Sequence, residues 1–197
     1  MVDLFVENWL ELVGLVSGVL CVWLLIRENI LTFPIGLTYA VVTVVVVGRA
    51  DLYADVLLNL YYVLMNAYGW YFWLYGGKER RQSGHDLLVV FASKKQWGVL
   101  LAITFAGTIA MGYGFSQIGA DLPYADSATT VASFVAMWMT ARKYIDSWIW
   151  WFVIDVVQIA LYLIKGIEAY ALLYFIYLGM AVWGWLAWKK HLQPQTT

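Results

Sequence analysis

The chain has 197 residues, of which 63% are hydrophobic and 13% are charged, and its formal net charge is −1. This composition is too apolar for a soluble domain and indicates an integral membrane protein. The near-zero net charge gives no reason to expect a nucleic-acid partner, and the single cysteine excludes an internal disulfide.

Seven apolar stretches follow one another along the chain, and most approach the roughly 20 residues that a helix needs to cross about 30 Å of hydrocarbon. They cover residues 9–26, 33–48, 55–75, 97–117, 124–141, 148–165 and 168–188. We therefore predict an all-α integral membrane protein with seven transmembrane helices in a lipid bilayer. The first eleven residues are acidic and contain no basic residue, unlike a signal peptide, so we expect the first span to be retained.

The basic residues segregate when these spans are threaded as alternating crossings. Ten of the twelve Lys and Arg residues fall on one side, and only Arg49 and Lys165 fall on the other. Because positively charged loops stay in the cytoplasm, this distribution predicts an N-terminus outside and a cytoplasmic C-terminus.

The sequence also repeats itself at an offset of 115 residues. The coinciding residues are Trp23 with Trp138, Arg27 with Arg142, Ile30 with Ile145, Gly69 with Gly184, Trp70 with Trp185 and Trp73 with Trp188. Chance matches between abundant tryptophans are the alternative, but a constant offset at both ends of the unit favours a duplication. We predict a 3+1+3 arrangement: a three-helix repeat at 9–75, a linker helix at 97–117 and a second repeat at 124–188.

Corresponding spans of the two repeats are separated by four crossings, an even number, so the repeats are expected to be parallel. Two similar halves enclosing one central site are typical of alternating-access carriers. A membrane transporter is therefore the first functional hypothesis.

Polar side chains within the spans are the candidate substrate contacts. Asp155 lies midway along the sixth span, where an acidic residue is costly and usually functional. Helical spacing places Trp148, Trp151, Asp155, Gln158 and Tyr162 on one face. This face could bind a flat aromatic cation by stacking, cation–π attraction and ion pairing. A protonated Asp155, or one paired with a basic residue, is the alternative, although no basic residue is predicted at that depth.

The third span carries a second polar stripe, formed by Asp55, Asn59, Tyr62 and Asn66. An unsatisfied amide in hydrocarbon would cost several kcal/mol, so these groups require partners. Two interpretations stay open for Asn59 and Asn66. Each either contacts the substrate or forms hydrogen bonds that hold neighbouring helices together.

At this point the sequence resembles a known family. The stretches WLELVGLVSGVLCVWLLIRENILTFPIGL, NAYGWYFW and TARKYIDSWIWWFVIDVVQIALYLIKGIEAYALLYFIYL are similar to the two halves of the PnuC family of bacterial vitamin transporters. The resemblance implies a fold related to the SWEET sugar transporters, a location in the bacterial inner membrane, and facilitated diffusion followed by phosphorylation of the substrate in the cytoplasm. It also implies that a homotrimer is possible, and that the substrate is nicotinamide riboside, thiamine or riboflavin.

Departures from the family pattern bear on the substrate. Tyr39, Asn59 and Asp155 stand where the nicotinamide riboside members are expected to have Asn, Gln and Asn. A carboxylate suits the thiazolium and the aminopyrimidine of thiamine, so we expect thiamine first, nicotinamide riboside second and riboflavin third. The predicted substrate-binding residues are Asp155, Asn59, Trp148, Trp151, Gln158, Tyr62, Asn66, Tyr39 and Tyr162.

An intramembrane enzyme is the competing class of function. It would need a catalytic set at membrane depth, but both histidines, His85 and His191, lie outside the predicted spans. The sequence has no GxxxxGK[ST] motif for ATP. We therefore predict a non-enzyme without cofactor or metal. Proton coupling through Asp155 is the alternative to facilitated diffusion.

Overall fold

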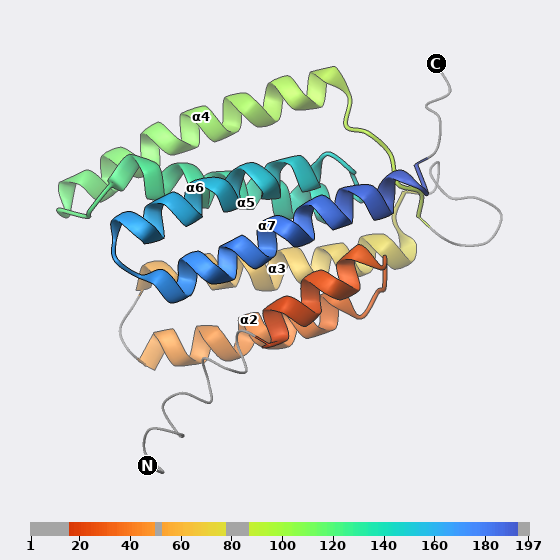
Figure 1. The fold of residues 1–197 in the computed structure, drawn as a ribbon, viewed down its shortest axis with the longest axis horizontal. Coiled ribbons are helices and arrows are strands. Elements are labelled where there is room, and N and C mark those ends of the chain that lie inside the picture. The colour runs from red at the N-terminus through yellow and green to blue at the C-terminus, as the bar shows by residue number, and fades with distance from the viewer. Residues whose placement is uncertain (1–15, 50–52, 78–86, 193–197) are drawn as a thin grey trace, which may run out of the picture. The chain divides into compact units, whose positions relative to one another are not determined.

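The computed structural model describes residues 16–49, 53–77 and 87–192, and the elements below lie in these ranges. Seven helices occupy them (Figure 1). They are Val16–Ile26, α2 (Thr32–Arg49), α3 (Tyr53–Tyr75), α4 (Lys94–Gln117), α5 (Pro123–Ala141), α6 (Ser147–Ile164) and α7 (Glu168–Lys189). The all-helical prediction is confirmed. Residues 9–15, the predicted start of the first span, lie outside the described residues.

Three described helices, α4, α6 and α7, are long and apolar enough to cross a membrane. Two shorter apolar helical segments lie in the first unit. They are the helix Val16–Ile26 and the part of α2 from Thr32 to Val44. Helix α4 begins at Lys94, three residues before the predicted span, because Ser93 caps it. The Ser93 hydroxyl accepts from the Gln96 backbone N–H at 3.2 Å, and the Gln96 side chain accepts from the Ser93 N–H at 2.8 Å.

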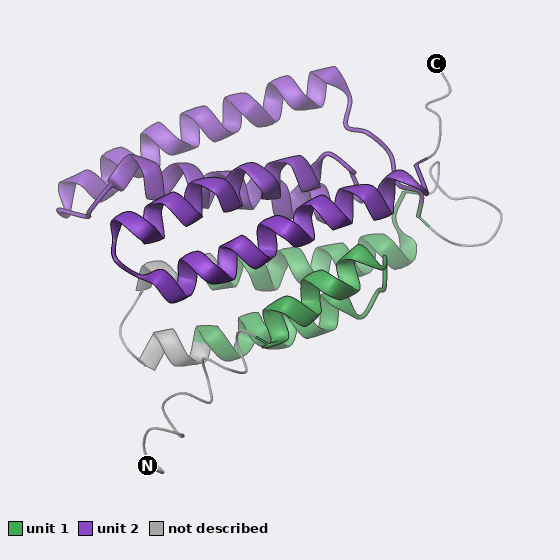
Figure 2. Cartoon of the chain, viewed as in Figure 1, with its two compact units in different colours: residues 1–87 green, residues 88–197 purple. Residues whose placement is uncertain are grey.

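The chain divides into two compact units, residues 1–87 and 88–197 (Figure 2). In the first unit, α2 packs against α3. The buried ring of Phe33 at the start of α2 lies against Gly69 of α3, where a Cβ would collide with the ring. The same ring meets Trp73 edge to face, with 5.0 Å between centroids. Glycine therefore permits the close approach of these two helices.

In the second unit, α4 packs on α5, α5 on α6, and α6 on α7. The start of α6 repeats the contact just described. Trp148 lies against Gly184 of α7 and meets Trp188 edge to face at 5.4 Å. Trp148 and Trp188 are both almost completely buried, so they form the core between α6 and α7.

The turns that lead into α2 and α6 also share their geometry. Glu28 and Lys143, 115 residues apart, have positive φ angles of 54° and 56°. One residue before each, an arginine lies over a tryptophan ring. Arg27 is 4.5 Å from the centroid of Trp23, and Arg142 is 5.6 Å from that of Trp138.

A short extended segment, the strap (residues 88–93), distinguishes the second unit. Val90 accepts a backbone hydrogen bond from Ile145 at 3.0 Å, in the turn before α6. Buried Asp146 accepts from the Ala92 N–H at 2.6 Å and from the Trp97 indole N–H at 3.2 Å. Leu31, at the corresponding position of the first unit, is 53% exposed. The strap therefore covers one of two otherwise similar turns.

Candidate functional site

Asp155 is a buried carboxylate near the middle of α6. Only 4% of the residue is exposed. Among the described residues, none forms a hydrogen bond or ion pair with it. A buried acidic group without a protein partner is costly, and in a membrane protein it usually serves an ion or substrate. Asp155 is therefore the centre of the candidate site.

Trp151 lies one turn before Asp155 on the same helix and is half-buried. Its indole N–H donates to the Thr140 hydroxyl of α5 at 3.1 Å, and that hydroxyl donates to the Ala136 carbonyl at 2.9 Å. This chain of hydrogen bonds fixes the orientation of the indole. Because its polar edge is already satisfied by α5, the ring can offer an aromatic face to a ligand.

Trp148 belongs to the same predicted stripe but occupies a different environment. Trp148 is 2% exposed, and its ring packs against Gly184 and Trp188. These contacts assign it to the α6–α7 core. The predicted role of Trp148 in stacking on a substrate gains no support from this position, because α7 already covers the ring.

The stripe continues beyond Asp155 through Gln158 and Tyr162, both half-buried. Tyr162 stacks on two tyrosines of α7. Its ring centroid is 5.2 Å from that of Tyr170 and 5.4 Å from that of Tyr174, with interplanar angles of 24° and 21°. One face of α6 therefore carries, in order along the helix, Trp151, Asp155, Gln158 and Tyr162.

The first unit holds the other predicted residues. Asn66 is buried; its amide donates to the Tyr62 carbonyl at 2.8 Å, and its oxygen lies where a Cβ on Gly36 of α2 would be. Asn66 thus packs in the α2–α3 contact, which favours the helix-packing interpretation for this residue. Asn59 is buried, Tyr62 is half-buried, and Tyr39 is 42% exposed.

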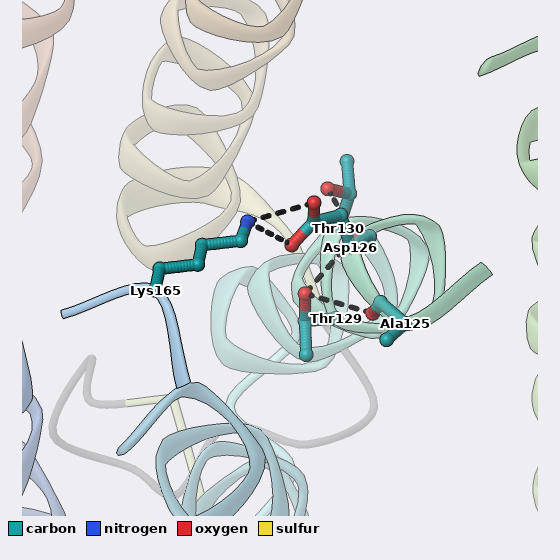
Figure 3. Close-up of polar contacts among 5 residues, drawn as sticks. All are labelled: Ala125, Asp126, Thr129, Thr130 and Lys165. Atoms are coloured by element: carbon teal, nitrogen blue, oxygen red, sulfur yellow. Dashed lines mark hydrogen bonds and ion pairs between the residues drawn. The ribbon is translucent and has the colours of Figure 1, made fainter. Parts of the chain in front are cut away.

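Two groups of contacting residues were missed by sequence reasoning. The first is Thr140, whose hydroxyl orients Trp151; a threonine on another helix gives no periodic signal. The second is the ion pair of Lys165 with Asp126, whose two carboxylate oxygens both lie 2.8 Å from the Lys165 ammonium (Figure 3). Opposite charges at the ends of neighbouring spans could have suggested this pair. The described residues contain no group of three or more His, Cys, Asp or Glu side chains that could hold a metal.

Comparisons with known proteins identify the family of this chain. The sequence model of the nicotinamide mononucleotide transporter family matches residues 8–190. The nicotinamide riboside transporter PnuC of Escherichia coli is 26% identical, over 92% of this chain and 85% of that protein. The riboflavin/roseoflavin transporter RibM of Streptomyces davaonensis is 27% identical, over 94% of this chain and 89% of that protein.

A solved structure gives the same result. The crystal structure of the vitamin B3 transporter PnuC has a TM-score of 0.71 and 25% identity, and the match covers 96% of this chain and 85% of that chain. These relatives are transporters and not enzymes, and the resemblance to the PnuC family noted from the sequence is confirmed. This chain belongs to the nicotinamide mononucleotide transporter family of membrane proteins.

Proposed function

We propose that this protein carries nicotinamide riboside across the bacterial inner membrane. The observation that supports this most directly is the buried carboxylate of Asp155, which has no hydrogen-bond or ion-pair partner among the described residues and lies one helical turn from an oriented indole. A positively charged pyridinium ring would supply the missing counterion and a flat surface for stacking. Nicotinamide riboside carries such a ring, and the PnuC relatives are named for it.

In this proposal the Asp155 carboxylate forms an ion pair with the pyridinium, and Trp151 stacks on that ring. Gln158 forms hydrogen bonds with the polar edge of the substrate. Asn59, in the first unit, stays a contact predicted from the sequence. The other predicted contacts, Tyr62, Asn66, Tyr39, Trp148 and Tyr162, are not needed for this minimal site.

Thiamine, which we expected first from the sequence, becomes the second candidate. No relative named above is a thiamine transporter, and four curated relatives are named for nicotinamide riboside. One observation still favours thiamine. Asp155 replaces the amide expected in nicotinamide riboside transporters, and a carboxylate can accept a hydrogen bond from the thiamine aminopyrimidine.

We further propose that the helices form two parallel repeats, 9–75 and 124–188, joined by the linker helix 97–117, and that alternating access moves the substrate by facilitated diffusion. Recurrence of the Phe33–Gly69 contact as Trp148–Gly184, at the same offset, supports the duplication. Phosphorylation in the cytoplasm would then retain the substrate, because a phosphate near buried Asp155 adds like-charge repulsion.

The test is isothermal titration of the purified protein with nicotinamide riboside, thiamine, riboflavin and nicotinamide mononucleotide. Nicotinamide riboside should bind at least tenfold more tightly than the other three ligands, a difference of about 1.4 kcal/mol. Tighter binding of thiamine would select the second candidate. Equal binding of the mononucleotide would contradict retention by phosphorylation.

A further inference from the structure

The end of the second unit at which α6 gives way to α7 contains a stack of tyrosine rings. Tyr162 of α6 stacks on both Tyr170 and Tyr174 of α7, and Tyr174 meets Tyr177 edge to face at 5.9 Å. Nearly parallel rings at these separations attract each other. The side chain of Tyr162 is therefore held against α7 by two stacking contacts and by a hydrogen bond with the Tyr174 side chain.

The same end is tied to α5 by charge. Lys165 follows α6 directly and binds both carboxylate oxygens of Asp126, in the first turn of α5 (Figure 3). The hydroxyls of Thr129 and Thr130 donate to the Asp126 carbonyl at 3.0 and 2.8 Å, within α5. Tyr162 thus lies one turn from the C-terminal end of α6, which contacts with α5 and α7 hold on two sides.

Tyr162 also lies on the face of α6 that carries Asp155. Seven residues separate them, or about 10 Å along the helix axis at 1.5 Å per residue. Gln158 lies between them on this face and is half-buried. A solute that moves along this face from the α6–α7 end therefore meets Tyr162 before Gln158, and Gln158 before Asp155.

We propose that Tyr162 is an aromatic gate that closes the route along α6 to Asp155 when its ring stacks on Tyr170 and Tyr174. Opening the gate separates two stacked pairs of rings. A planar aromatic solute can restore this stacking as it passes, whereas an aliphatic solute of similar size cannot. The gate therefore favours planar aromatic cargo, which deepens the proposed function and rests on it for the identity of the cargo.

The closed gate can be tested without a substrate, by the reactivity of a thiol placed behind it. Cys21 is the single cysteine, so Cys21→Ser gives a background without thiols, and the serine hydroxyl can retain the hydrogen bond to the Thr32 carbonyl. Gln158→Cys is then introduced behind the gate. Membrane vesicles of both orientations are treated with a negatively charged, impermeant methanethiosulfonate reagent.

Ile118→Cys in the same background serves as the side marker. Ile118 is 77% exposed and caps the C-terminal end of α4, close in sequence to the start of α5. The vesicle orientation in which this thiol reacts is the one in which the reagent reaches the α6–α7 end. The experiment therefore does not depend on the predicted topology.

Three further substitutions are combined with Gln158→Cys. Tyr162→Ala should raise the labelling rate at least tenfold in the orientation that the marker selects. Tyr162→Phe keeps the stacked ring and loses only the hydroxyl that hydrogen-bonds with Tyr174, so it should label much more slowly than Tyr162→Ala. Tyr113→Ala removes a 62% exposed tyrosine from α4 as a matched control and should also label slowly.

The proposal is overturned by rapid labelling of the parent, by slow labelling after Tyr162→Ala, or by equal acceleration in Tyr162→Phe or Tyr113→Ala. The substrate assignment fails independently, when the unsubstituted protein does not bind nicotinamide riboside in titration. The labelling experiment tests the gate, and the titration tests the substrate. Either one can fail while the other succeeds, so the two failures can be told apart.

Discussion

Replacing Asp155 with Asn is the most direct test of the buried carboxylate. The substitution keeps the size of the side chain and one acceptor oxygen but removes the negative charge. Two unit charges about 4 Å apart interact by about 4 kcal/mol at an effective dielectric constant of about 20. Part of this energy offsets the loss of water from both charges. We therefore expect at least about 1.4 kcal/mol of lost binding energy, or a tenfold higher Kd for nicotinamide riboside.

The assay is isothermal titration with two forms of the ligand. Reduced nicotinamide riboside has a similar size but no positive charge on its ring, so Asp155→Asn should change its Kd by less than about threefold. Asp121→Asn, in the exposed loop before α5, should change neither affinity. An unchanged Kd for the oxidised ligand in Asp155→Asn refutes ion pairing. Equal losses for both forms show that the carboxylate acts by shape or hydrogen bonding.

Two further predictions concern stability, measured as the midpoint of thermal unfolding in detergent. Asp146→Asn weakens the charge-assisted hydrogen bonds to the strap and should lower the free energy of unfolding by about 2 kcal/mol. The control Asp121→Asn should leave the unfolding midpoint unchanged. Equal midpoints for the two variants would contradict the role of the strap. Gly184→Ala should cost about 1–3 kcal/mol because its Cβ meets the Trp148 ring, whereas Gly179→Ala, which meets nothing within 4 Å, should be neutral or stabilising. Equal effects of the two alanines would refute the packing argument.

The helices were predictable because long apolar stretches leave few alternatives. Helix α6 was expected at 148–165 and occupies Ser147–Ile164. The start of α4 was misplaced because its first turn is polar and is defined by a cap. The strap was missed because an extended segment of about six residues that pairs with a distant turn has no periodic signal of its own.

The face of α6 was predicted, but the partner of each residue on it was not. Trp148 and Trp151 are three residues apart, and helical periodicity assigns both to one stripe. Packing then separates them. Gly184 of α7 lets that helix cover Trp148, whereas the hydroxyl of Thr140 in α5 binds the edge of Trp151. Sequence spacing gives the direction of a side chain but not the helix that it meets.

Comparison of residues 115 positions apart shows which contacts recur in the two units. One contact that holds a helix pair together keeps its character, since an aromatic ring lies against glycine in both units. Asp155 corresponds to Ala40, so the carboxylate at the centre of the candidate site has no counterpart in the first unit. A difference in polarity does not by itself mark substrate recognition, because Asp146, which corresponds to Leu31, binds the strap. Asp155 is buried and has no hydrogen-bond or ion-pair partner among the described residues, so it is the strongest candidate.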